Sequence, residues 1–259
     1  MLTTAASYRS IVSDIGKSLA RTAADPVVAR ETEYYLAHIG GVKTIDDFLS
    51  DKRLFAYAMK AFGLSDMANA KGFMRKVLEG GIDDPASFAN RLTDTRYRDF
   101  AAAFDFAKYG PFATTFAAAT TGTKDAYLRQ SLELKAGDQS DGVRLALYFQ
   151  RKAPQVTSAY GILADKALTE VVRTALALPT PGPAADIDSQ AAAITSRLDL
   201  EDLQSPDKLK RFLQRFAAQW DATHAPKLPA LPSIGVGQAL SGLSGDLLLS
   251  LQKLKLGGI

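Results

Sequence analysis

Signals that begin α-helices recur along the chain, whereas runs of alternating β-branched residues bounded by turn pairs are absent from it. Asp25-Pro26 places a capping carboxylate before a proline at the first helical position, and Asp84-Pro85 and Ser205-Pro206 repeat this kind of signal. Thr44, with Asp47 three residues later, resembles a capping box in which Asp replaces the usual Glu. Because almost nothing in the chain is suited to a sheet, the sequence predicts an all-α multi-helix bundle.

Apolar residues at helical spacing fill the stretches between these signals. The helix that follows Asp25 should end at Gly40-Gly41 in a left-handed cap. The helix over residues 52–62 should be capped by Asp51 and stopped by Gly63. Further helices are predicted over residues 67–78, 95–107, 124–135, 142–152, 166–178, 189–198 and 207–222.

The chain contains an internal repeat. A shift of 114 positions gives nine identities within a window of 35 residues, which is several times the chance expectation of roughly two or three. The identical pairs are Arg30 and Arg144, Tyr34 and Tyr148, Val42 and Val156, Leu49 and Leu163, Asp51 and Asp165, Lys52 and Lys166, Leu54 and Leu168, Ala61 and Ala175, and Leu64 and Leu178. The prediction is two related helical halves, residues 1–122 and 123–224, that form one compact domain.

The repeated residues are interpreted as a structural signature. Asp51 and Asp165 should cap helices, and Tyr34 and Tyr148 should pack into the core with their hydroxyls on a partner or water. The signature comprises Arg30, Tyr34, Asp51, Lys52, Leu54, Gly63, Leu64, Arg144, Tyr148, Asp165 and Lys166. The alternative, a duplicated pair of catalytic carboxylates, has no base, nucleophile or metal partner nearby in the sequence.

Composition argues against several kinds of chemistry. The 259 residues include no cysteine, which excludes disulfides, thiolate zinc sites and thiol catalysis, and the two histidines, His38 and His224, share no motif. Acidic pairs such as Asp46-Asp47 are better explained as helix caps than as cation ligands. We therefore expect no enzymatic activity, no catalytic residue, no cofactor and no metal site.

Charge and hydropathy limit the possible partners. The net charge of +3 comes from 31 basic and 28 acidic residues that are interleaved along the chain, so no nucleic-acid partner is predicted. The densest basic stretch, residues 208–211 with Arg215, is interpreted as a solvated helix face, with a phosphate contact as the alternative. No apolar run is long enough to span a membrane, and the first residues lack the pattern of a cleavable secretory signal.

The character of the chain changes after His224. Residues 225–236 form a proline-rich linker, and residues 237–259 have the pattern of an amphipathic helix. Its leucine seam consists of Leu240, Leu243, Leu247, Leu251 and Leu254. These leucines should be covered by a partner protein (another protein or a second copy of the chain), by the helical domain or by a membrane surface. The linker favours a partner, and a membrane is the weakest of the three because only Lys253 and Lys255 supply positive charge.

Several runs resemble a known family. They extend from Tyr34-Tyr35-Leu36 and the stretch 39–54 through Ala61-Phe62-Gly63-Leu64 to residues 73–81 and 88–97. They are similar to domain-of-unknown-function family 1217, alphaproteobacterial proteins encoded among flagellar genes and often labelled flagellar basal-body rod proteins. The resemblance covers about residues 30–220, and it implies no catalytic residues.

The resemblance implies a non-enzymatic structural or accessory protein of bacterial flagellum assembly, located in the basal body or the cytoplasm, with flagellar components as its partner proteins. True rod proteins have a β-rich middle domain that this sequence lacks, so an accessory role is favoured over a rod subunit. The alternative is a cytoplasmic helical binding module, a chaperone or regulator that holds a flagellar export substrate.

Overall fold

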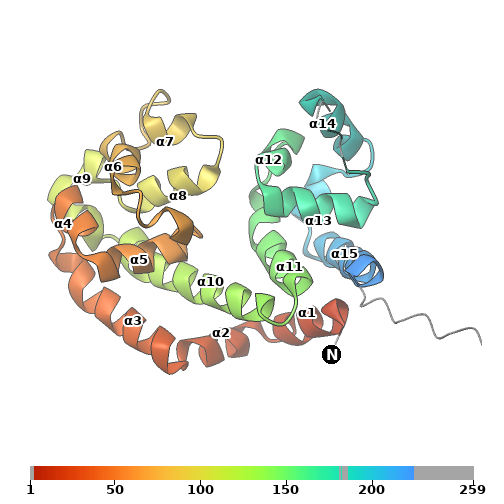
Figure 1. The fold of residues 1–259 in the computed structure, drawn as a ribbon, viewed down its shortest axis with the longest axis horizontal. Helices are drawn as coiled ribbons and strands as arrows, with labels where there is room; N and C mark the ends of the chain where they lie inside the picture. Colours follow the sequence, from red (N-terminus) through yellow and green to blue (C-terminus); the bar gives the residue numbers. More distant parts are fainter. Residues whose placement is uncertain (1–2, 181, 183–185, 225–259) are drawn as a thin grey trace, which may run out of the picture. The chain divides into compact units, whose positions relative to one another are not determined.

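The computed structural model describes residues 3–180, 182 and 186–224, and in these residues every regular element is helical (Figure 1). The predicted all-α fold is confirmed. The linker 225–236 and the leucine-rich segment 237–259 lie outside the described residues, so both stay predictions of the sequence. Met1–Thr223 forms one compact unit.

The α-helices are joined by short 3₁₀ turns and, at η4, by a π-helical turn. In chain order the elements are α1 (Thr4–Val12), α2 (Ile15–Ala23), α3 (Pro26–His38), η1 (Ile39–Gly41), α4 (Ile45–Ser50), α5 (Lys52–Ala61), η2 (Ser65–Met67), α6 (Lys71–Glu79), α7 (Phe88–Arg91), α8 (Thr95–Ala103), α9 (Phe106–Tyr109), η3 (Gly110–Thr115), η4 (Ala118–Gly122), α10 (Thr123–Gly137), α11 (Asp141–Lys152), η5 (Ala153–Gln155), α12 (Ala159–Leu163), α13 (Lys166–Leu176), α14 (Ile187–Thr195), η6 (Leu200–Leu203) and α15 (Pro206–His224).

The internal repeat is visible in the order of the elements. In the first half, α3 leads through η1 and the short α4 to α5, and in the second half α11 leads through η5 and α12 to α13. η1 and η5, α4 and α12, and α5 and α13 each begin 114 residues apart, the same offset that the identities give. The sequence repeat is therefore also a repeat of structure.

Several predicted caps are present. The Asp25 side chain accepts a hydrogen bond from the backbone N–H of Val27 at the start of α3. Thr44 and Asp47 form the reciprocal capping box at the start of α4. Two helices that the sequence analysis did not predict, α1 and α2, also begin with such caps, from the side chains of Thr3 and Asp14.

Several predicted boundaries are wrong. The predicted helix 67–78 begins only at Lys71, and the predicted helix 189–198 ends at Thr195. Asp84-Pro85 starts no helix, because the Asp84 side chain closes a turn onto the Ala86 N–H, and α7 begins only at Phe88. Gly40 and Gly41 do not adopt a left-handed cap. Instead, α3 continues into the 3₁₀ turn η1, and the Gly40 carbonyl accepts a hydrogen bond from the Lys43 side-chain amine. The predicted helix 95–107 is two helices, α8 and α9, because the Asp105 side chain caps the start of α9. The predicted helix 166–178 ends early, at Leu176, because Ala177 adopts the left-handed conformation.

Gly63 does end α5 as predicted, with φ of +71°. A side chain would be strained in this conformation.

Each half has its own hydrophobic core. The first core is built around stacked and edge-on phenylalanines, among them Phe48, Phe55 and Phe100. The second contains Phe149 and Phe216, and the run Phe216-Ala217-Ala218 matches the run Phe100-Ala101-Ala102 of the first half. Both Phe100 and Phe216 are completely buried.

The cores do not follow the sequence division at residue 122. α10 contributes Tyr127 to the first core and Ala136 to the second, and it packs against both α5 and α11. Tyr8 of α1 belongs to the second core, although it lies at the start of the first half in sequence. The two halves are thus joined by α10, which contributes to both cores, and by α1, which packs in the second core.

Candidate functional site

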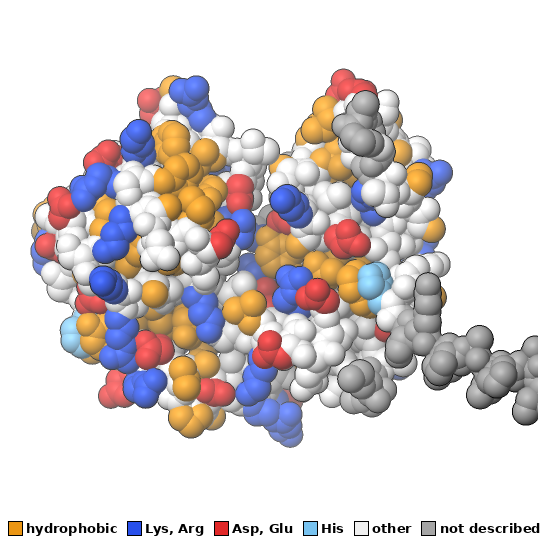
Figure 2. Space-filling view, in the orientation of Figure 1, with side chains coloured by type: hydrophobic (Ala, Val, Ile, Leu, Met, Phe, Trp, Pro, Cys, Tyr) orange, Lys and Arg blue, Asp and Glu red, His pale blue; other side chains and the backbone are white. Residues whose placement is uncertain are grey.

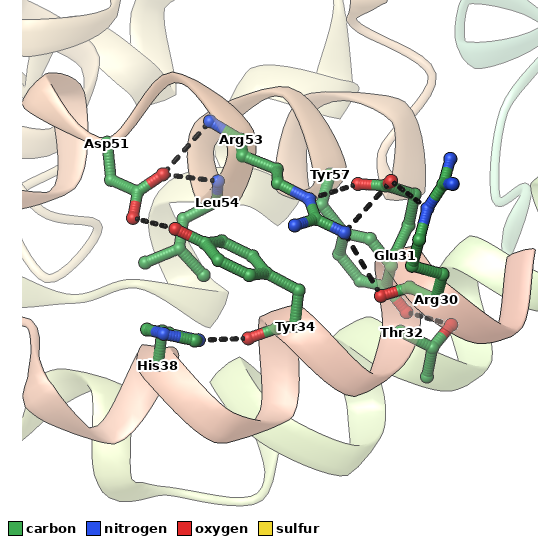
Figure 3. A network of polar contacts seen from close by, with 9 residues as sticks. All are labelled: Arg30, Glu31, Thr32, Tyr34, His38, Asp51, Arg53, Leu54 and Tyr57. Carbon is green, nitrogen blue, oxygen red and sulfur yellow. Dashed lines mark hydrogen bonds and ion pairs between the residues drawn. The ribbon is translucent and has the colours of Figure 1, made fainter. Parts of the chain in front are cut away.

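The first signature cluster lies where α3 meets the start of α5 (Figure 3). Asp51 Oδ1 accepts hydrogen bonds from the backbone N–H groups of Arg53 and Leu54, both at 3.0 Å. Asp51 Oδ2 accepts a third hydrogen bond from the Tyr34 hydroxyl at 2.9 Å. Burial alone would raise the pKa of Asp51, but these hydrogen bonds outweigh it and hold the pKa below its usual value.

An ion pair and a histidine ring flank Tyr34. The Arg53 guanidinium lies 3.9 Å from the centre of the Tyr34 ring and forms a two-point ion pair with Glu31, at 2.7 and 3.1 Å. The His38 ring stacks on the Tyr34 ring, with the ring centres 4.1 Å apart. His38 Nδ1 lies 2.7 Å from the Tyr34 carbonyl oxygen. The hydrogen bond to Asp51 raises the pKa of Tyr34, so the phenol stays neutral and cannot serve as a base near neutral pH.

The second signature cluster repeats the same core geometry. Asp165 Oδ1 accepts from the N–H groups of Ala167 and Leu168 at 2.8 and 3.1 Å, and Asp165 Oδ2 accepts from the Tyr148 hydroxyl at 2.6 Å. Burial, followed by the charge of Asp165, raises the pKa of Tyr148 well above its ordinary value. In both clusters the tyrosine and aspartate are 17 residues apart.

The arginine over each tyrosine ring has a different origin. In the first cluster it is Arg53, two residues after the aspartate, whereas in the second it is Arg151, three residues after the tyrosine and 5.1 Å from the ring centre. Arg151 makes a two-point ion pair with Glu133 of α10, at 2.8 and 2.7 Å. The same arrangement of carboxylate, tyrosine and guanidinium is therefore reached by two sequence routes.

A cleft of about 520 Å³ lies beside the second cluster. Residues from both halves and from α10 line it, namely Gly63, Thr93, Asp94, Arg96, Gln130, Glu133, Arg144, Tyr148, Ala164, Asp165, Lys166 and Ala167. Five of these are predicted signature residues: Gly63, Arg144, Tyr148, Asp165 and Lys166. The structure thus gathers the second copy of the signature in one place.

Several charged residues of the cleft form ion pairs, some within the lining and some with residues outside it. Arg96 holds Asp94 through Nε at 3.0 Å and Nη2 at 2.7 Å, and it donates another hydrogen bond to the Gly63 carbonyl. Glu133 is only 1% exposed and is neutralised by Arg151, with Arg129 at 3.4 Å. Each of these pairs joins residues of the same half: Arg96 and Asp94 belong to the first half, and Glu133 and Arg151 belong to the second.

The rest of the signature lies elsewhere. Leu54 and Leu64 are buried in the first core, while Lys52 and Arg30 are exposed, with Arg30 3.5 Å from Glu31. Asp51 is not among the residues that line the cleft, so the structure does not bring it to Asp165. In the described residues, no group of three or more His, Asp or Glu side chains is placed to hold a metal ion.

One surface feature was not predicted from the sequence. Tyr109, Phe112 and Phe116, called here the aromatic patch, are exposed around η3, and Phe112 is 65% exposed. The rings of Tyr109 and Phe116 lie with their centres 4.6 Å apart. The signal available in the sequence was three aromatic residues flanking Gly110-Pro111, a pair that breaks regular structure.

Comparison with known proteins identifies the family. A family model described as "Protein of unknown function (DUF1217)" matches residues 61–209. The chain belongs to this family. The match confirms the family resemblance found from the sequence. None of the curated proteins matches this DUF1217 chain.

A solved structure shares its fold. The X-ray crystal structure of a protein from Agrobacterium tumefaciens is 50% identical in sequence and superposes with a TM-score of 0.80. The alignment covers 86% of this DUF1217 chain and 97% of the Agrobacterium chain. Among the described residues, this DUF1217 chain has no helix that is both long and apolar enough to cross a bilayer.

Proposed function

We propose that this protein is a non-enzymatic structural or accessory protein of bacterial flagellum assembly, in the basal body or rod, and that it acts by contact with other proteins. The flagellar part of the proposal is supported by the family resemblance given by the sequence. The mode of action is supported by the surface and by the chemistry of the clusters.

The aromatic patch is the observation that carries the proposal. Phe112 is 65% exposed, and Tyr109 and Phe116, close to it in sequence, are 43% and 45% exposed. Three large rings within eight residues of sequence are exposed to water, two of them in contact with each other, and exposed apolar surface of this kind is typical of protein interaction sites. Aromatic side chains also contribute much of the binding energy in protein interfaces.

The polar clusters support a role without catalysis. Tyr34 and Tyr148 have raised pKa values and donate to carboxylates, so neither is activated as a nucleophile or base. Asp51 and Asp165 each use one oxygen on the backbone of a helix and the other on a tyrosine. Their geometry is fully accounted for by holding helices in place.

A strain in which the gene is deleted tests the proposal. We expect loss of swimming and of filaments, and we expect the complementing protein to appear in purified basal bodies. Complementation with Phe112→Ser should fail although that variant folds. Val27→Ser is the matched control, since Val27 is 56% exposed but lies at the end of α3 opposite η1, the turn that contacts η3.

Three outcomes would contradict parts of the proposal. Normal swimming of the deletion strain would remove the flagellar role. A soluble pool bound to a single export substrate, with none in the basal bodies, would favour a cytoplasmic chaperone or regulator. Equal rescue by Phe112→Ser and Val27→Ser would show that the aromatic patch is not the contact surface.

A further inference from the structure

The basic stretch of α15 presents one charged face. Lys208, Arg211 and Arg215 are spaced three and four residues apart, so they lie on the same side of the helix, and all three are exposed. Arg197, which follows α14, faces them across a pocket of about 360 Å³. We call this the arginine pocket, and its full lining is Arg197, Leu198, Asp199, Asp202, Leu203, Lys208, Arg211, Phe212 and Arg215.

The positive charge of the arginine pocket is only partly balanced. Asp202 forms an ion pair with Lys208, and Asp199 uses its carboxylate to cap η6 through the Glu201 N–H at 3.0 Å. Across residues 3–180, 182 and 186–224, Arg211 and Arg215 form no ion pair. Four basic and two acidic side chains line the pocket, so an anion brought to it would be attracted.

The floor of the arginine pocket is apolar. Leu198, Leu203 and Phe212 are buried beneath the charged rim, and Arg215 lies 5.8 Å from the centre of the Phe212 ring. Arg197 also borders a second, apolar pocket of about 290 Å³ between α13 and α14. That pocket is lined by Leu163, Arg173, Leu178, Pro179, Ser189, Gln190, Ala193, Ile194 and Arg197.

We infer that the arginine pocket and its apolar neighbour bind an acidic segment of another protein, whose carboxylates contact the arginines while an adjacent large apolar side chain enters the apolar pocket. Guanidinium groups bind carboxylates with two parallel hydrogen bonds, which suits Arg197, Arg211 and Arg215. This inference adds the chemistry of a partner to the proposed protein-binding function, at a surface separate from the aromatic patch.

Charge distinguishes this occupant from the chain's own C-terminal segment. Residues 225–259 carry three lysines, Lys227, Lys253 and Lys255, and a single acidic residue, Asp246. A segment with net positive charge is poorly suited to a pocket rimmed by arginines. An acidic partner protein satisfies both the charge and the apolar floor.

Nucleic acid suits the pocket less well than an acidic protein. The aromatic ring of the lining, Phe212, is buried and offers no exposed face on which a base could stack. The phosphate contact considered for this stretch therefore becomes an outcome of the test.

The test uses the full-length chain and a random-peptide display library. Peptides selected on the wild-type protein should be enriched in Asp and Glu next to Leu, Ile or Phe. The strongest peptide, synthesised with a fluorescent label, should bind about tenfold more weakly to Arg211→Glu and to Arg197→Glu, as expected for loss of one charged hydrogen bond. Arg98→Glu on α8 is the matched control, because Arg98 is exposed and lies outside the pocket.

Each alternative has its own readout. The inference is overturned if the library yields no acidic peptides, or if the labelled peptide binds the Arg211→Glu and Arg98→Glu variants equally. It is also overturned if a synthetic peptide of residues 237–259 or a single-stranded DNA oligonucleotide binds more tightly than the acidic peptide in an Arg211-dependent way. Arg211-dependent self-association in sedimentation experiments would instead assign the surface to a second copy.

These outcomes are separate from those of the flagellar proposal. Peptide binding is measured on the purified protein, so it can succeed even where the deletion strain swims normally. Conversely, a swimming defect with no peptide binding would leave the flagellar role and remove only the acidic partner.

Discussion

Replacing Asp165 with Ala should destabilise the protein more than replacing Asp51 with Ala, although both carboxylates cap a helix in the same way. Loss of either cap costs about 1 kcal/mol. At Asp165 a second loss is added, because the Tyr148 hydroxyl, 2.6 Å away in an environment dominated by burial, loses its acceptor. An unsatisfied hydroxyl of this kind costs about 1–2 kcal/mol.

The expected losses are therefore about 2–3 kcal/mol for Asp165→Ala and about 1 kcal/mol for Asp51→Ala. For a unit of this size, the larger loss lowers the melting temperature by about 5–10 °C. Urea unfolding followed by far-ultraviolet circular dichroism at neutral pH measures both free energies.

Removal of the tyrosine hydroxyl is the control that isolates the second loss. Tyr148→Phe should lower stability in the wild-type background but restore part of it in the Asp165→Ala background, because the phenylalanine has no hydroxyl to satisfy. Tyr34→Phe should show much weaker coupling to Asp51→Ala, since the pKa of Tyr34 is raised first by its hydrogen bond and less by burial. Equal losses at Asp51 and Asp165, or additive effects of Tyr148→Phe and Asp165→Ala, would refute this reasoning.

Three further predictions concern packing and charge. Gly142→Ala should cost about 1–3 kcal/mol and shift the emission of Trp220, the single tryptophan, because the new Cβ would collide with the indole ring. Unchanged fluorescence would contradict this packing. Glu133→Gln should cost about 3 kcal/mol in urea unfolding by leaving Arg151 unpaired, and a neutral effect would show that water replaces the carboxylate. Burial would raise the pKa of Asp94, but the guanidinium of Arg96 holds this pKa below its usual value. The stabilisation that the Asp94 carboxylate gives is therefore complete above about pH 4 and is lost as the pH falls through the lowered pKa. Asp94→Asn should therefore flatten the loss of stability in acid, and a denaturation series from about pH 7 to about pH 3 that matches wild type would contradict it.

Helix starts could be predicted because a cap is a local contact. The carboxylates of Asp51 and Asp165 reach N–H groups only two and three residues away, so the sequence around them contains the whole interaction. Asp84 shows the limit of this approach. Its side chain reaches the Ala86 N–H at 2.8 Å in a turn that does not continue as a helix.

The pairing of the signature residues was within reach of the sequence only in part. The repeat indicated that Tyr34 and Asp51 correspond to Tyr148 and Asp165, but their direct hydrogen bonds join residues that are brought together by the packing of two helices. The arginines over the rings occupy unrelated positions in the two halves, so no repeat analysis could find them.

Glu133 is the residue that the sequence concealed most completely. It lies in a polar helical stretch that is typical of a solvated face, yet it is buried and paired because α10 packs between the two cores. The packing of α1 in the second core was hidden from the sequence for the same reason. Both depend on contacts between segments far apart in the chain.

The sequence alone determined that this protein is helical, where many of its helices begin, and that its two halves share one plan, because capping and hydrophobic periodicity act over a few residues. Tertiary structure decided which charges are buried, which signature residues share a cleft, and which rings and arginines remain on the surface. Burial depends on the packing of distant helices, and solvent exposure sets the energy of every charged or aromatic side chain.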